Sequence, residues 1–196
     1  GSRSSDPRFD WDDPETWAKA NPGKISFGSS GIGAAAHLTT ELLKQTAGID
    51  MVHVPYKGAG PASQAVVAGD VGVTISSVPA VQGFIKDGRL RALAVGSDKR
   101  FALLPDVPTM KESGVDGDIL VPTYFALAAP AGTPPAIVAK LNAEMKKALA
   151  DPAVAERFVA AGLVPSGSSP EAMTALVKSD VARFGELVKA IGIKPE

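Results

Sequence analysis

The 196 residues carry 20 basic and 21 acidic side chains, a net charge of −1, and 45% hydrophobic residues. This balance is typical of a globular chain and argues against a nucleic-acid or membrane-binding surface. Cysteine is absent, which excludes disulfides, thiolate metal sites and cysteine nucleophiles. The two histidines, His37 and His53, match no common zinc spacing, so we expect no metal ion.

The first half of the chain predicts alternating helices and strands. Residues 1–13 are interpreted as a vector-derived scar followed by a polar linker. Asp13-Pro14 then predicts the start of a short helix that ends near Ala20. Short apolar runs predict four strands, and small-residue segments between glycines and prolines predict helices; the strands are 24–27, 51–54, 71–75 and 90–95, and the helices 34–47, 62–68 and 80–86. Such alternation is typical of an α/β layer with a mostly parallel sheet.

The second half has a different composition. A proline-flanked apolar segment at 119–135 precedes three predicted helices at 134–150, 152–161 and 170–191. We therefore expect two packing units, an α/β ligand-binding lobe over 14–118 and a helical segment over 119–196.

The segment "KISFGSSGIGAAAHL", residues 24–38, predicts a strand, a glycine-rich turn and a helix N-terminus, an arrangement that binds anions. It contains G-x-G-x-x-A, but Asp50 precedes the next strand instead of ending it, so we exclude a dinucleotide site. No lysine follows the glycines as in a phosphate-binding P-loop, and the serines lack the G-x-S-x-G spacing of a nucleophile elbow. No cofactor is expected.

The same residues offer no evident catalytic group. No partnership with a histidine and an acid can be assigned to Ser29 or Ser30, and His37 is more typical of a packed, hydrogen-bonded residue than of a base. Two interpretations of the turn stay open. It is either a cradle for a small anion or a tight strand-to-helix turn that needs small residues.

The ends of the other predicted strands favour the cradle. In a parallel α/β sheet, ligands collect at the carboxyl ends of the strands. Those ends are rich in hydrogen-bond donors and poor in acids, which suits a carboxylate; the residues are Ser29, Ser30, Gly31, Tyr56, Lys57, Gly58, Ser76 and Ser77. A solvated surface lysine is an equally good interpretation of Lys57.

Long stretches of the chain resemble the Bug-type periplasmic solute-binding proteins of tripartite tricarboxylate transporters. The resemblance is carried by "NPGKISFGSSGIGAAAHLTTELLKQTAGIDMVHVPYKGAGPASQAVVAGDV", "GRLRALAVGSDKRFALLPDVPTMKESG", "FALAAPAGTPPAIVAKLNAEMKKALADPAVAERF" and the terminal "AIGIKPE". It implies a two-lobed Venus-flytrap receptor and no enzymatic activity. The receptor is expected in the periplasm, where it delivers a di- or tricarboxylate or an aromatic acid to membrane permease subunits.

The resemblance also implies which residues bind the ligand. The glycine–serine turn of the family lines the cleft, which transfers to Ser29, Ser30, Gly31, Gly33 and Ala34. The V-P-Y-K-G loop transfers to Tyr56, Lys57 and Gly58, and the next strand end to Ser76 and Ser77. Many relatives have an Asp-Asn-like pair at Ser76-Ser77, so its absence argues against an amino-acid ligand. The hinge aromatic, commonly Trp in the family, is Tyr124 here.

Nothing before Pro14 resembles the family's first lobe, so we expect the chain to comprise the second lobe and the C-terminal segment that packs on the first lobe in relatives. Helices without those packing partners would expose apolar surface, which self-association or a domain swap would cover. Two alternatives stay open. One is a hydrolase-like enzyme that uses the turn from Gly28 to Gly33 as an oxyanion hole, and the other is an effector-sensing module.

Overall fold

The computed structural model describes residues 13–115 and 124–192. These residues form two compact units, one on each side of the undescribed stretch. The predicted linker, apart from Asp13, and positions 119–123 of the predicted hinge segment lie outside the described residues. The assignment of 14–118 and 119–196 to particular lobes of a receptor stays a prediction.

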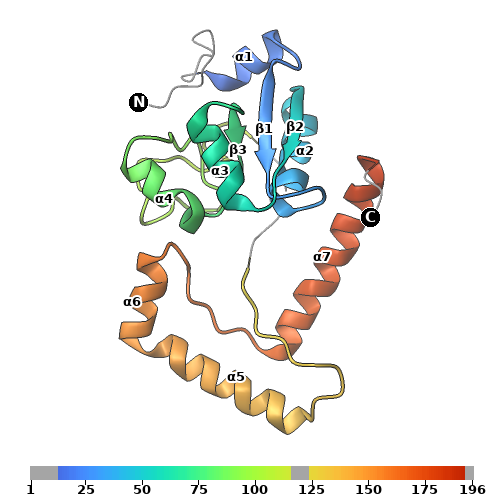
Figure 1. Ribbon diagram of the computed structural model, residues 1–196. Helices are drawn as coiled ribbons and strands as arrows, with labels where there is room; N and C mark the ends of the chain where they lie inside the picture. The colour runs from blue at the N-terminus through green and yellow to red at the C-terminus, as the bar shows by residue number, and fades with distance from the viewer. Residues whose placement is uncertain (1–12, 116–123, 193–196) are drawn as a thin grey trace. The chain divides into compact units, whose positions relative to one another are not determined.

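The first unit is built around a three-stranded parallel sheet in the order β2-β1-β3 (Figure 1). The central strand aligns Phe27 with His53 of β2 and with Val73 of β3. Helices alternate with the strands as predicted, with boundaries shifted by one to three residues; the elements are α1 (Pro14–Ala20), β1 (Ile25–Ser29), α2 (Ala35–Ala47), β2 (Met51–Pro55), α3 (Ala59–Ala68), β3 (Val73–Thr74) and α4 (Val78–Lys86).

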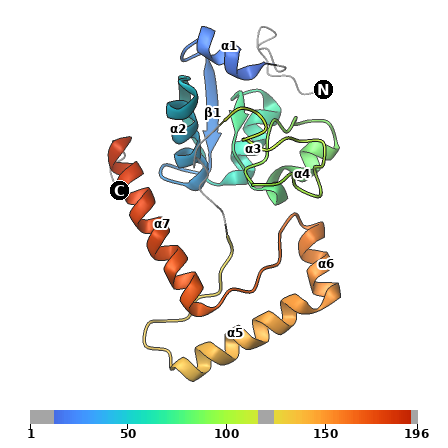
Figure 2. The ribbon, with the colours of Figure 1, turned by 180° about the vertical axis from the view of Figure 1, so that it is seen from behind.

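Helices α2 and α3 cover opposite faces of β1 (Figure 2). The Phe27 ring stacks with His37 of α2, whereas a Cβ at Gly28 would lie 3.5 Å from the Ala62 carbonyl of α3. Neighbouring residues of a strand point to opposite faces, so these contacts place the two helices. A side chain at Gly28 would also lie 3.3 Å from the Tyr56 ring, which explains the glycine.

The core of the first unit joins α1 to the sheet. Ala18, Ile25, Phe27 and Met51 are buried together, with Trp17 packed against them. The Thr74 hydroxyl donates to the Gly28 carbonyl at 2.8 Å and fixes the short strand β3 against β1. Because the three strands are parallel, their carboxyl ends share one edge of the sheet.

The prediction of a fourth strand at 90–95 is wrong. Of these residues only Val95 takes part in a β-bridge, an isolated parallel bridge to Thr109. Its N–H donates to the Pro108 carbonyl and its carbonyl accepts from the Met110 N–H. The segment "LRALAV" contains two alanines and an arginine, which are weaker strand formers than the β-branched residues of β2.

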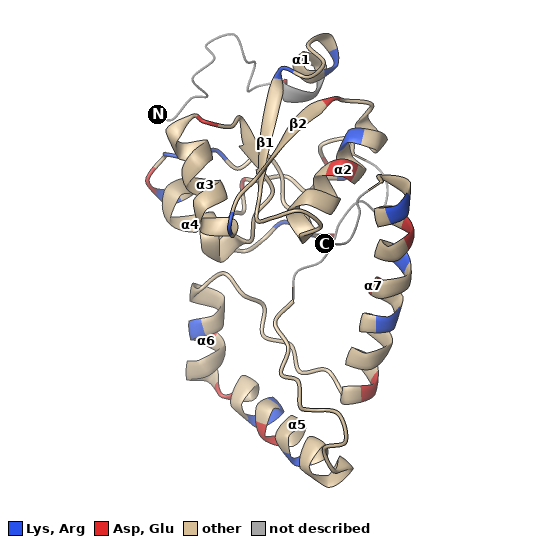
Figure 3. Ribbon diagram, turned by 45° about the vertical axis from the view of Figure 1, so that its right-hand side comes forward, with Lys and Arg blue, Asp and Glu red and all other residues tan. Residues whose placement is uncertain are grey.

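The second unit contains α5 (Pro135–Ala150), α6 (Pro152–Ala160) and α7 (Pro170–Ala190). Positive and negative side chains lie along α5 and α7 (Figure 3). Large apolar side chains are nevertheless exposed in this unit, with Phe125 at 78%, Val164 at 73% and Val181 at 69%. Self-association through this surface stays a prediction. Among the described residues, no helix combines the length and hydropathy needed to cross a membrane.

Candidate functional site

Three helices of the first unit begin at the carboxyl edge of the sheet. Helix α2 follows β1 after the loop 30–34, α3 follows β2 after 56–58, and α4 follows β3 after 75–77 (Figure 1). Each strand-to-helix turn is short, so the N-termini of the helices, which carry partial positive charge, converge on this edge. This is the edge at which open α/β sheets bind ligands.

These three helices lack side-chain caps. The side chains of their N-cap residues, Ala34, Gly58 and Ser77, form no capping hydrogen bond, and no acidic residue lies in the first turn. In contrast, Asp151 caps α6 and Ser169 caps α7 through their side chains. The first N–H groups of a helix have no partner within the helix, so at the sheet edge they can bind an external acceptor. The Ala80 N–H of α4 is an exception, because it donates to the Ser77 carbonyl at 3.0 Å.

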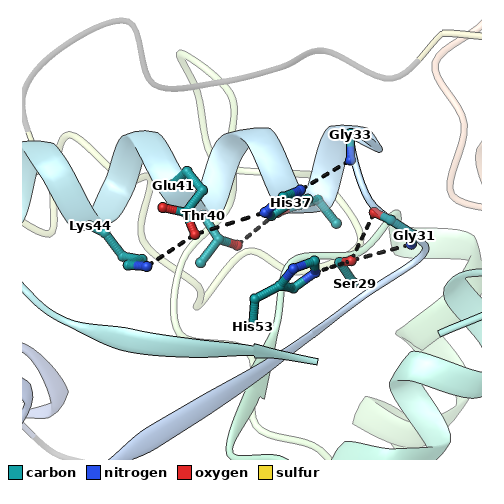
Figure 4. Close-up of polar contacts among 9 residues, drawn as sticks. Ser29, Gly31, Gly33, His37, Thr40, Glu41, Lys44 and His53 are labelled. Atoms are coloured by element: carbon teal, nitrogen blue, oxygen red, sulfur yellow. Dashed lines mark hydrogen bonds and ion pairs between the residues drawn. The ribbon is translucent and has the colours of Figure 1, made fainter. Parts of the chain in front are cut away.

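The loop between β1 and α2 uses some of its N–H groups internally (Figure 4). The Gly31 N–H donates to Ser29 Oγ, the Gly33 N–H to His37 Nδ1, and the Ala34 N–H to the Gly31 carbonyl. Other N–H groups find no acceptor within the part of the chain that the structure describes, namely those of Ser30, Ile32, Ala35 and Ala36. The loop therefore orders itself and leaves a separate set of donors available.

A pair of stacked histidines lies beneath this loop. The rings of His37 and His53 are 3.8 Å apart with an interplanar angle of 10°, and His53 also stacks on Phe27 at 4.8 Å. Burial lowers the pKa of His37, and burial together with His37 lowers the pKa of His53 from 6.5 to about 4. Both imidazoles are therefore neutral near pH 7.

Ser29 has a histidine partner that its sequence context does not reveal. Its Oγ lies 2.6 Å from His53 Nε2 and donates to the Gly31 carbonyl at 3.0 Å. The Ser29 side chain is fully buried, with an exposed fraction of 0%. A nucleophile must reach its substrate, so this pair orders the loop and does not fit the hydrolase alternative.

The other predicted site residues have different environments. Tyr56 packs over Gly28, Lys57 is exposed, and Gly58 has a φ of 114° that favours glycine. Ser76 Oγ lies 3.5 Å from the buried Ser63 hydroxyl, and Ser77 is the N-cap of α4.

Tyr124 belongs to the second unit, and its pKa is raised by desolvation and by Asp180, whose carboxylate accepts its hydrogen bond. The first unit thus brings together, at one edge of the sheet, the predicted ligand-binding residues from Ser29 to Ser77. Tyr124 belongs to the second unit.

The sequence analysis did not identify the roles of His37, His53 and the amides of Ile32, Ala35 and Ala36. One signal was available for His53, which is two residues from the buried Met51 and therefore on the same face of β2. The expectation that His37 is packed and hydrogen-bonded is confirmed by its exposure of 6% and its bond to Gly33. The amides of Ile32, Ala35 and Ala36 belong to apolar residues and have no side-chain signature.

Comparisons with protein families and with curated proteins point to the same family. Residues 4–193 match the family described as the tripartite tricarboxylate transporter family receptor, TctC. A protein of Pseudomonas sp. strain P51, encoded between tcbD and tcbE, is 41% identical over 171 residues, which are 87% of this chain and 51% of that protein. Protein BugT of Bordetella pertussis is 38% identical over 176 residues, 90% of this chain and 54% of BugT. The chain thus spans about half the length of these curated relatives.

Solved structures agree with the sequence comparisons. The structure of R. palustris Rpa4515 with adipate has a TM-score of 0.88 and 34% identity, and the match covers 99% of this chain and 64% of Rpa4515. The periplasmic binding protein BugD has a TM-score of 0.81 and 34% identity, and the match covers 99% of this chain and 65% of BugD. MatC from Rhodopseudomonas palustris with bound malate has a TM-score of 0.75 and 28% identity, and the match covers 95% of this chain and 64% of MatC.

The predicted α/β fold of periplasmic binding proteins is confirmed by these structures, and so is the resemblance to the Bug-type receptors. The family consists of solute-binding receptors of transporters and not of enzymes. On this basis, the chain belongs to the TctC family of tripartite tricarboxylate transporter receptors.

Proposed function

We propose that this chain is the carboxylate-binding part of a periplasmic receptor that delivers a small dicarboxylate to the permease of a tripartite tricarboxylate transporter. One observation carries the proposal, namely the three helix N-termini without side-chain caps at a single edge of the sheet. Relatives whose solved structures contain adipate or malate support this ligand class.

Backbone donors supply the attraction for the anion. The open N–H groups of Ser30, Ile32, Ala35 and Ala36 belong to one loop and the first turn of one helix. Hydrogen bonds to a charged acceptor contribute about 1.5–3 kcal/mol each, roughly twice a neutral one. The helix dipole adds about 0.3–1 kcal/mol for an anion near the first turn. These terms favour a carboxylate over its neutral amide.

The chemistry around the donors selects against a ligand that also carries an ammonium group. No acid occurs in the first turns of α2, α3 and α4, and the strand end after β3 provides Ser76 and Ser77. An ammonium group in a partly dry site needs a carboxylate partner. We therefore propose an acid without an amino group, with Lys57 in the loop before α3 available as an exposed cation for the distal carboxylate.

Calorimetric titration of the chain with adipate and malate, against adipamide and malamide, tests the proposal. The informative variant is Ala35→Pro, which removes one open N–H at the first helical position, where proline is tolerated. Ala34 has φ −68° and ψ 159°, which suits a residue before proline. We expect the variant to weaken carboxylate binding about ten- to hundredfold, the effect of one charge-assisted hydrogen bond.

Ala35→Gly is the matched control because it changes the same residue but keeps the N–H, and it should retain affinity. The proposal is contradicted if the diamides bind as tightly as the diacids, since the site would then not recognise charge. It is also contradicted if Ala35→Pro folds and binds adipate and malate like the unmodified chain.

A further inference from the structure

The β1–α2 loop takes its conformation from a histidine below it. The backbone N–H of Gly33 can only donate, so His37 Nδ1, 3.0 Å away, must accept with an unprotonated lone pair (Figure 4). His37 is therefore neutral with its proton on Nε2, on the side of Glu41, whose Oε1 lies 3.9 Å away. This hydrogen bond fixes the last turn of the loop before α2.

The second histidine secures the other end of the same loop. The single proton of the Ser29 hydroxyl goes to the Gly31 carbonyl, so the 2.6 Å contact is made by His53 Nε2–H donating to Ser29 Oγ. Ser29 Oγ in turn accepts the Gly31 N–H at 3.2 Å. His53 keeps this bond whether neutral or protonated, because Nε2 donates in both forms. Only the bond between Gly33 and His37 depends on the protonation state.

We infer that His37 is a positioning residue of the carboxylate site: its neutral Nδ1 holds the loop in the shape that presents the Ser30 and Ile32 amides, and a proton on His37 lowers the affinity for carboxylates. This inference rests on the proposed function. A proton on Nδ1 would face the Gly33 N–H, donor against donor at 3.0 Å, and that turn of the loop must then move.

An opposing electrostatic effect is weakened by the surroundings of His37. A positive charge on His37 would attract an anion, but its Nε2–H is aimed at Glu41 from the same helix, which also pairs with Lys44 at 3.0 Å. From β2 the neutral His53 ring faces it, and from β1 the uncharged Phe27 ring. Because Glu41 pairs with the charge on the side away from Gly33, loss of the loop geometry dominates.

The test needs the ligand-free chain first. Amide and imidazole ¹⁵N spectra recorded between about pH 7 and pH 5 report the Gly33 N–H and both histidines directly. We expect the Gly33 amide to shift and lose exchange protection in step with protonation of His37. If Gly33 is indifferent to His37, or if His37 stays neutral over the whole range, the inference is overturned, and neither result depends on a ligand.

The second part of the test measures the affinity for adipate. In His37→Asn the amide Oδ1 lies one bond from Cγ, like Nδ1, so it can accept from Gly33 but takes no proton. Protonation of adipate itself affects both proteins equally. Between about pH 7 and pH 5 the unmodified chain should lose about two- to tenfold more affinity than His37→Asn, the equilibrium effect of one hydrogen bond.

Equal losses, or a relative gain in affinity on acidification, overturn the inference. Absence of adipate and malate binding at every pH contradicts the proposed function instead, and the ligand-free spectra then still decide whether His37 holds the loop.

Discussion

Acid should destabilise the first unit through its stacked histidine pair, and His53 allows the effect to be estimated. Its pKa falls from 6.5 to about 4 in the folded protein because burial and His37 disfavour the charged form. The unfolded chain therefore binds more protons than the native one between these values. The contribution of His53 to the free energy of unfolding is complete above pH 6.5 and is lost as the pH falls towards 4.

The magnitude follows from the difference between the two pKa values. A depression from 6.5 to about 4 corresponds to about 3 kcal/mol at 1.36 kcal/mol per pH unit. The His53 side chain is only partly buried, and solvent screening reduces the expected effect to about 1–2 kcal/mol. His53→Gln removes the titration while keeping a side-chain amide that can donate to Ser29.

Urea unfolding at several pH values between about 7 and 4 measures the effect. The chain has two tryptophans, and Trp17 packs on the core of the first unit, so Trp11→Phe leaves Trp17 as the only tryptophan and its emission as the signal of unfolding. Carboxylates contribute the same acid dependence to both proteins. The unmodified chain should lose about 1–2 kcal/mol more than His53→Gln over this window. Parallel stability curves for the two proteins would refute the reasoning.

Three further substitutions test other parts of the account by chemical denaturation. Gly33→Ala should cost about 1–2 kcal/mol because Gly33 has a φ of 73°, with no atom within 4 Å to add a clash. The control Gly60→Ala in α3 should stabilise by about 0.5–1 kcal/mol, and equal effects of the two substitutions would contradict a requirement for the left-handed conformation at residue 33. Thr74→Val should cost about 1–3 kcal/mol by leaving the Gly28 carbonyl without its 2.8 Å donor, and an unchanged midpoint would exclude that role. Asp151→Ala should cost about 0.5–2 kcal/mol by uncapping α6, seen as reduced helical circular dichroism, while Asp151→Asn should preserve the cap.

The alternation of strands and helices in the first unit could be predicted because each turn carries its own signal. Gly48 ends α2 in the left-handed conformation, and proline lies near the start of α4, so local residues define the boundaries. The segment 90–95 misled the prediction because its apolar residues indicate burial without indicating a partner. Its Val95 pairs with Thr109 instead of the sheet, a choice made by tertiary packing.

The candidate site could be predicted as a region but not donor by donor. The glycine-rich turn and the strand ends located the edge of the sheet. Which amides are open depends on which ones Ser29 and His37 already occupy, and those bonds depend on the register that aligns Phe27 with His53. A contact between residues 24 positions apart leaves no local pattern, so Ser29 and His53 could not be paired from the sequence.

Titration of the ¹⁵N-labelled chain with adipate, with adipamide as the neutral control, tests the central claim most directly. The account predicts that the amides of Ser30, Ile32, Ala35 and Ala36 shift downfield with adipate and stay in place with adipamide, because only a carboxylate accepts these open N–H groups as a charge-assisted partner. If adipate leaves all four amides unmoved up to about 10 mM, well above a weak Kd of about 1 mM, the proposed site is contradicted.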